Sequence, residues 1–137
     1  MTSDDIFPTE LTDRSFQASN GEFGWNREDA RLVVSILARR QLAILGGELW
    51  WLPDETTAWT GLIPQRHGPA AVYPWETVQM KGEAWAAYVE RCASESLQSI
   101  ARWPAPDDLP ADLPGRILYN LTWVAETEYS NNGAEAL

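Results

Sequence analysis

Reactive side chains are scarce in this chain of 137 residues, which holds one cysteine and one histidine. The single cysteine, Cys92, excludes an internal disulfide, and its place on the inner face of a predicted helix indicates a small buried hydrophobe. The single histidine, His67, follows Arg66 in a predicted loop. A Ser-His-Asp triad or a Cys-His catalytic pair would have to use this one side chain. No ligand spacing indicates a zinc site. We therefore expect no metal and no cofactor.

Long apolar runs are also missing. None reaches the ~18 residues that a membrane-spanning helix needs. The first five residues, Met1-Thr2-Ser3-Asp4-Asp5, are polar and acidic, which is unlike a secretory signal. With a single cysteine, these features predict a protein of the reducing cytoplasm that does not enter a membrane.

Basic residues are few, with 10 Lys and Arg against 20 Asp and Glu, and the formal net charge is −10. They are dispersed and form no stripe of the kind that binds nucleic acid. The acidic excess is concentrated in residues 1–30 and 101–137. Such a field repels nucleic acids and anionic membranes and attracts a basic partner. Solubility alone is the other explanation of the charge.

Catalytic motifs are equally sparse. No serine stands in a G-x-S-x-G context, and Gly46-Gly47 lacks the frame of a phosphate-binding loop. Paired carboxylates can carry out acid–base chemistry in a cleft. The candidate pairs are Asp4/Asp5, Asp107/Asp108 and Glu126/Glu128. A solvated loop or strand edge explains each pair as well, so we expect a protein that is not an enzyme.

Indole rings, in contrast, are abundant: the chain holds eight tryptophans and is 45% hydrophobic. This length and apolar content predict a single domain, 1–137, with a substantial core. Most of the tryptophans are expected in that core. One or two exposed rings would serve as anchors for a partner.

Periodicity predicts two main helices, 26–41 and 80–102. Asn26 is a suitable N-cap, acidic residues follow it, and Arg39-Arg40 suit the C-terminal end. Proline ends the second helix after Trp103. Residues 1–24 are expected to form an irregular arm, and residues 130–137 a frayed tail.

Apolar runs and alternation predict four strands, at 42–52, 57–62, 70–78 and 116–128. The first is apolar on both faces, which indicates an interior position, and is expected to form a hairpin with the second. Pro74 favours a sheet edge for the third. In the last strand one side carries Ile117, Tyr119, Leu121 and Trp123, and the other Leu118, Asn120, Thr122 and Val124. The predicted fold is α+β, a mostly antiparallel sheet of about four strands with two main helices on one face.

One stretch resembles a known family. Trp25-x-x-x-Asp29-Ala30, a helix and then Leu42-Ala43-Ile44-Leu45-Gly46-Gly47-Glu48-Leu49-Trp50 are similar to one family of bacterial immunity proteins from polymorphic toxin systems. Tyr73-Pro74-Trp75-Glu76 and the helix with Tyr88-Val89 and Ser94 follow in the same order. The resemblance covers about residues 21–100. Glu48 stands where the family has Asp, and Pro74 lies inside the third strand.

The resemblance implies a small cytoplasmic antidote that binds a cognate toxin domain and blocks its active site or substrate entry. It assigns no catalytic residue. A toxin that acts on nucleic acid is expected to be basic, so an acidic binder would gain association rate by steering. The partner-binding candidates are Glu48, Trp51, Asp54, Glu55 and Trp59 on the first hairpin, with Glu76 on the neighbouring strand. A solvated strand face or turn is the other explanation of each, and the oligomeric state is left open.

Two other functions remain at this point. A small hydrolase would use a carboxylate pair, Glu126 and Glu128, or His67, inside a concave pocket. A small-ligand or sugar-binding module would use exposed tryptophan faces.

Overall fold

Two long antiparallel strands form the middle of the molecule. In the computed structural model, which describes residues 6–129, β3 (Ala43–Leu52) pairs with β5 (Arg116–Val124) along their whole length, with Leu49 opposite Tyr119. The full sheet has the order β1-β2-β5-β3-β4, and every pairing is antiparallel. The remaining strands are short: β1 (Phe16–Gln17), β2 (Phe23–Trp25) and β4 (Pro74–Glu76).

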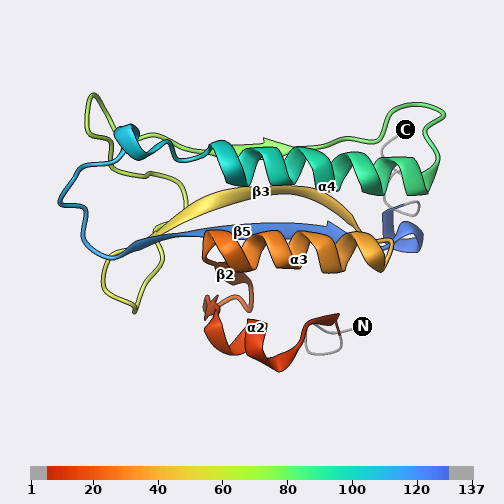
Figure 1. The fold of residues 1–137 in the computed structure, drawn as a ribbon, viewed down its shortest axis with the longest axis horizontal. Helices are drawn as coiled ribbons and strands as arrows, with labels where there is room; N and C mark the ends of the chain where they lie inside the picture. Colours follow the sequence, from red (N-terminus) through yellow and green to blue (C-terminus); the bar gives the residue numbers. More distant parts are fainter. Residues whose placement is uncertain (1–5, 130–137) are drawn as a thin grey trace.

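Two helices cover one face of this sheet (Figure 1). They are α3 (Arg27–Arg39) and α4 (Trp85–Arg102), which pack side by side against β3 and β5. A short helix, α2 (Thr9–Arg14), precedes β1, and a 3-10 turn, η1 (Pro106–Asp108), follows α4. No helix among residues 6–129 is both long enough and apolar enough to cross a bilayer.

Local sequence explains where α3 begins and ends. The Asn26 side chain accepts a hydrogen bond from the Asp29 backbone N–H at 2.8 Å, which satisfies a free donor of the first turn. Arg14 of α2 in turn makes a two-pronged ion pair with the buried Asp29 carboxylate. At the other end Gln41, with φ 58°, turns the chain out of the helix and into β3.

The main core lies between the helices and the sheet. Its largest enclosed side chains include Trp25, Tyr88 and Leu49, none more than 2% exposed. Burying a side chain of this size favours folding by about 1.5–3 kcal/mol. A smaller apolar cluster occupies the opposite face at one end of β3 and comprises Trp50, Leu52 and Leu118. No helix of residues 6–129 covers the rest of that opposite face.

The predicted fold class is confirmed, with five strands in place of about four. Residues 57–62 do not form a strand: their backbone pairs with β3 only through an isolated bridge from Trp59 to Trp51. The reason is local, since Asp54 hydrogen-bonds within its own turn and Glu55 has φ 67°, so the chain leaves β3 without a regular hairpin. The predicted strand 70–78 is reduced to β4, which is an edge strand, as Pro74 indicated.

The termini also differ from the sequence prediction. Residues 1–24 were expected to be irregular, but α2, β1 and the start of β2 lie there, and Phe7 and Leu11 belong to the core. These elements are only two to six residues long, too short to produce a periodic pattern. The last strand ends at Val124 and a helical turn replaces its predicted final residues. The predicted tail, 130–137, lies outside the described residues.

The missing side chain at Gly47 allows the Trp75 ring of β4 to lie against β3. A Cβ at this position would collide with the Trp75 ring and with the carbonyl oxygen of Asn120. We therefore predict that Gly47→Ala lowers the free energy of unfolding by about 1–3 kcal/mol, because an over-packed site must shift its neighbours. Urea unfolding measures the change. Gly61→Ala is the control, since nothing lies within 4 Å of that site, and its effect should stay within about 0.5 kcal/mol. Equal effects of the two substitutions would contradict the packing argument.

Candidate functional site

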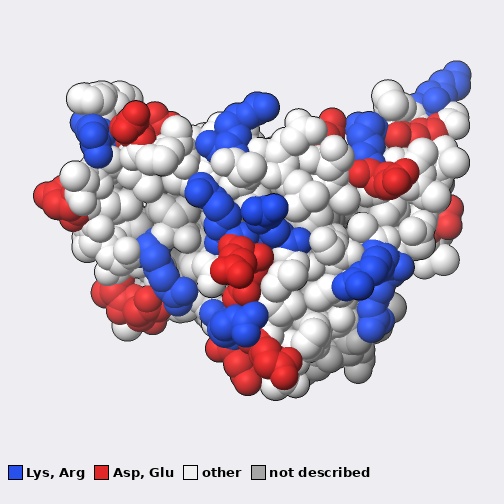
Figure 2. Space-filling view, in the orientation of Figure 1, with Lys and Arg blue, Asp and Glu red and all other residues white. Residues whose placement is uncertain are grey.

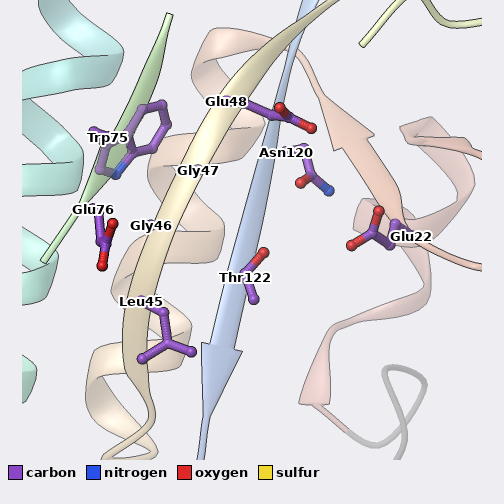
Figure 3. A pocket seen from close by; sticks show the side chains of 9 residues that line it. All are labelled: Glu22, Leu45, Gly46, Gly47, Glu48, Trp75, Glu76, Asn120 and Thr122. Carbon is purple, nitrogen blue, oxygen red and sulfur yellow. The ribbon is translucent and has the colours of Figure 1, made fainter. Parts of the chain in front are cut away.

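A hollow of about 360 Å³ lies on the sheet face that the helices leave bare (Figure 3). We call it the acidic hollow. It is lined by Glu22, Leu45, Gly46, Gly47, Glu48, Trp75, Glu76, Asn120 and Thr122. In Figure 3 the strands lie in front of the helices, and the polar side chains come from β3, β4, β5 and the turn before β2.

The register of three strands brings these residues together. Gly46 on β3 lies opposite Glu76 on β4 and opposite Thr122 on β5. The next pair on this face is Glu48 with Asn120. Because side chains alternate between faces along a strand, these residues share one surface. Gly46 adds no side chain to this surface, because the backbone carbonyl of Trp75 occupies the place of a Cβ there, and the pairing of β3 with β5 shifts by one residue at Leu45.

The polar groups around the hollow are mostly hydrogen-bond acceptors. Within residues 6–129, none of the carboxylates of Glu22, Glu48 and Glu76 forms an ion pair with Lys or Arg. Asn120 is 4% exposed and donates its amide to the Phe23 carbonyl at 2.9 Å, which leaves its own carbonyl oxygen beside the hollow (Figure 3). Such a site suits a ligand that brings positive charge and several N–H donors.

A metal ion does not fit the carboxylates as they stand. Among the described residues no three His, Cys, Asp or Glu side chains lie close enough to hold one ion. Glu48 accepts a hydrogen bond from Trp50 Nε1 at 3.1 Å, and Glu22 accepts one from Asn20 at 2.8 Å. The three carboxylates therefore surround a space that is better filled by an extended organic cation.

The opposite face has a different charge pattern. Figure 2, in the orientation of Figure 1, shows Lys and Arg side chains over α3 and α4 with Asp and Glu side chains between them. Arg27 and Arg31 line a groove there together with Glu28 and Leu32. Arg27 donates to Tyr119 Oη and to the Trp103 carbonyl, each at 3.1 Å. Despite the net charge of −10, the surface is therefore not uniformly acidic, and unpaired carboxylates face the bare side of the sheet.

Strand β4 is held in place through its inward side chains. Trp75 lies over Gly47 and donates from Nε1 to Ser96 Oγ of α4 at 3.1 Å. Two residues on, Thr77 donates to Glu95 at 2.6 Å, and its carbonyl accepts a 2.6 Å hydrogen bond from Tyr88 Oη. Burial raises the pKa of Tyr88, which keeps its phenol a donor. These contacts leave Glu76 directed toward the hollow.

The six partner-binding candidates from the sequence fall into two groups. Glu48 and Glu76 line the acidic hollow. The other four lie together at the C-terminal end of β3, the far end from the start of the strand at Ala43. They are Trp51, Asp54, Glu55 and Trp59, and the ring centroids of Trp51 and Trp59 are 6.2 Å apart.

The second group has internal partners. Glu55 makes a two-pronged ion pair with Arg116 at 2.8 Å. Asp54 accepts hydrogen bonds from Thr56, which lower the pKa of its carboxyl group. Trp51 donates to the Pro114 carbonyl, and Trp59 is 57% exposed. The two acids are thus already engaged within the chain.

Sequence reasoning missed Glu22, Asn120 and Thr122 as site residues. The alternation along residues 116–128 did place Asn120 and Thr122 on one side of a strand, and the structure confirms this. Glu22 gave no such signal, because it reaches the hollow only through the pairing of β2 with β5, about a hundred positions later in the chain.

The other two functions considered from the sequence were a small hydrolase and a small-ligand or sugar-binding module. Glu126, Glu128 and His67 are all open to solvent, so none has the burial that a catalytic cleft would provide. Of the eight tryptophans, all within the described residues, Trp59 alone is exposed. Two of them, Trp25 and Trp50, are buried, and the other five are partly buried against the main core.

Comparison with known proteins adds no assignment: no family model, no curated protein and no solved structure matches this chain.

Glu83 fixes the segment that follows β4. Its carboxylate pairs with Arg91 at 2.8 Å and accepts from the Met80 backbone N–H at 3.0 Å, while Arg91 also donates to the Val78 carbonyl. The Arg91 guanidinium and the Met80 amide lower the pKa of Glu83 from 4.5 to about 2. The ionised Glu83 carboxylate thus holds the backbone at Met80 directly and the backbone at Val78 through Arg91.

We predict that Glu83→Gln destabilises the protein at neutral pH and that this loss disappears in acid. The lowered folded-state pKa stabilises the native chain fully above pH 4.5, and this contribution is lost as the pH falls to about 2. Urea unfolding of both proteins between pH 7 and pH 2 measures the difference. Glu90→Gln, at an exposed position on α4 beside Arg91, is the control. A pH-independent difference would contradict the ion-pair explanation.

Proposed function

We propose that this protein is an immunity protein, a cytoplasmic antidote that binds a cognate bacterial toxin domain and blocks its active site without catalysing a reaction. The observation that carries the proposal is the acidic hollow: Glu22, Glu48 and Glu76 have no cationic partner within residues 6–129 and surround one space on a bare sheet face. The resemblance of residues 21–100 to immunity proteins supports the same function.

The physical argument concerns what unpaired carboxylates do for a binding protein. They add no ion-pair energy to folding, since none of them has a cationic partner within residues 6–129. They do raise the rate of encounter with a basic surface, and they select against acidic partners. A toxin domain that acts on nucleic acid needs a basic substrate surface. A protein that covers that surface with its own carboxylates would keep the substrate out.

The bare sheet face is also suited to docking for steric reasons. Helices cover the other face, so a partner can approach β3, β4 and β5 directly (Figure 1). These strands are already paired in the sheet, which limits the conformational entropy lost on binding. A preformed acidic surface of this kind is what rapid neutralisation of a toxin inside the cell would require.

The proposal predicts that the adjacent reading frame encodes a toxin and that this protein protects cells against the C-terminal domain of that toxin. Co-expression should restore growth, and the two purified proteins should form a complex. The association rate, measured by stopped-flow fluorescence, should fall steeply as salt rises from about 50 to 500 mM, because ions screen steering. No protection and no complex would contradict the proposal.

A charge-matched pair of variants tests where the partner binds. The triple variant Glu22→Gln, Glu48→Gln, Glu76→Gln should lower the association rate about tenfold or more. The control, Glu90→Gln, Glu126→Gln, Glu128→Gln, removes the same number of charges at exposed sites outside the hollow. Its effect should be several times smaller. Equal effects of the two variants would indicate that net charge alone, rather than the hollow, attracts the partner.

A further inference from the structure

Most of the large exposed apolar side chains belong to one segment of the chain, which includes the edge strand β4. Among the described residues six such side chains are about half exposed or more, and five of them lie in residues 59–80. They are Trp59, Leu62, Val72, Val78 and Met80, with exposed fractions of 56–60%. Scattered exposed apolar residues are ordinary, but a row of them along an edge strand indicates an interaction surface.

Within this segment the exposure alternates with a period of two. From residue 71 to residue 80 every second residue is exposed, and those between are partly or fully buried. The covered ones are anchored: Tyr73 donates to Gln65, Trp75 to Ser96 and Thr77 to Glu95. The exposed ones form what we call the β4 stripe, which consists of Val72, Pro74, Glu76, Val78 and Met80.

The β4 stripe and the acidic hollow meet at Glu76. This side chain lines the hollow and stands in the middle of the stripe, with Pro74 and Val72 on one side and Val78 and Met80 on the other. No hydrogen bond or ion pair engages the Glu76 carboxylate within residues 6–129. A ligand that reaches it therefore meets apolar contacts on both sides and further acceptors, Glu48 and Asn120, across β3.

We propose that the β4 stripe and the acidic hollow form one docking surface for an arginine of the toxin domain, flanked by apolar side chains. This inference rests on the proposed function and names the chemistry of the partner. A guanidinium presents five N–H donors in a plane, so it can donate hydrogen bonds to carboxylates that lie on separate strands. The flanking apolar side chains of the partner pack on Val72, Val78 and Met80.

The partner lies on the face of the sheet and does not add a strand to its edge. Thr77 directs its N–H to the Leu45 carbonyl, so the alternate residues Pro74, Glu76 and Val78 direct their backbone groups away from β3. Pro74 has no N–H to offer, and the Val78 carbonyl is occupied by Arg91 at 2.7 Å. The edge therefore offers too few free groups for a paired strand.

The far end of β3 is a poorer site for a cation, although Trp59 and Leu62 are exposed there. Glu55 is neutralised by Arg116, and Asp54 is held by Thr56. Apolar side chains are similarly exposed at both ends of residues 59–80. The two candidate sites therefore differ in their unpaired carboxylates, which only the acidic hollow has.

The experiment uses the whole protein, labelled with ¹⁵N, and a capped peptide Val-Leu-Arg-Leu-Val. Addition of the peptide up to about 10 mM, where weak contacts are measurable, should shift the amide signals of Gly46, Glu76, Val78 and Asn120 in a saturable way. The same peptide with citrulline, the neutral isostere of arginine, should bind at least about fivefold more weakly. This comparison needs no variant protein.

Two single variants locate the contacts. Glu76→Gln should weaken the arginine peptide about fivefold and remove most of its advantage over the citrulline peptide. Val78→Thr should weaken both peptides equally, because it changes an apolar contact and no charge. Glu90→Gln, on the exposed side of α4, should leave both affinities unchanged. Thermal unfolding confirms that each variant is folded.

Several outcomes would overturn the inference: no saturable shift, equal response to the two peptides, or shifts centred on α3 and α4 or on Trp59. The toxin domain separates this inference from the proposed function. If the domain is neutralised and keeps its affinity for the Glu76→Gln protein, the function stands and the docking surface is wrong. If the peptide binds as expected while the domain is neither bound nor neutralised, the surface stands and the proposed function fails.

Discussion

The contact of the Trp75 ring with Gly47 is the interaction on which the rest of the surface depends. The ring can lie across β3 only because position 47 has no side chain, and its N–H is bonded to Ser96 of α4. One residue thus joins the edge strand to both the sheet and the helix layer. With Trp75 directed inward, the period of two along the strand places Glu76 on the open face.

Neighbouring glycines are needed here for the same reason. At Gly47 the place of a side chain is taken by the Trp75 ring on the helix side, and at Gly46 it is taken by the backbone carbonyl of Trp75. The dipeptide therefore allows β4 to approach β3 closely through both a side chain and the backbone. The pairing of β3 with β5 shifts by one residue next to the dipeptide, at Leu45.

Sequence patterns predicted the parts of the fold that are long and regular. The cap at Asn26, the apolar spacing of α3 and α4, and the alternation along β5 each involve many residues with the same period. Glu48 and Glu76 were placed on neighbouring strands for the same reason. Glu22 could not be found this way, because its position depends on pairing between strands far apart in the chain. Residues 57–62 looked like a strand by composition, but the turn chemistry of Asp54 and Glu55 overrode that preference.

Pro74 has a consequence for the behaviour of the protein at high concentration. A sheet edge flanked by exposed Val72 and Val78 would ordinarily serve as a template for other copies of the chain, and repeated addition leads to fibrils. Pro74, the first residue of β4, has no N–H and so interrupts the ladder of donors that such growth requires. Apolar side chains can then remain accessible without polymerisation of the protein.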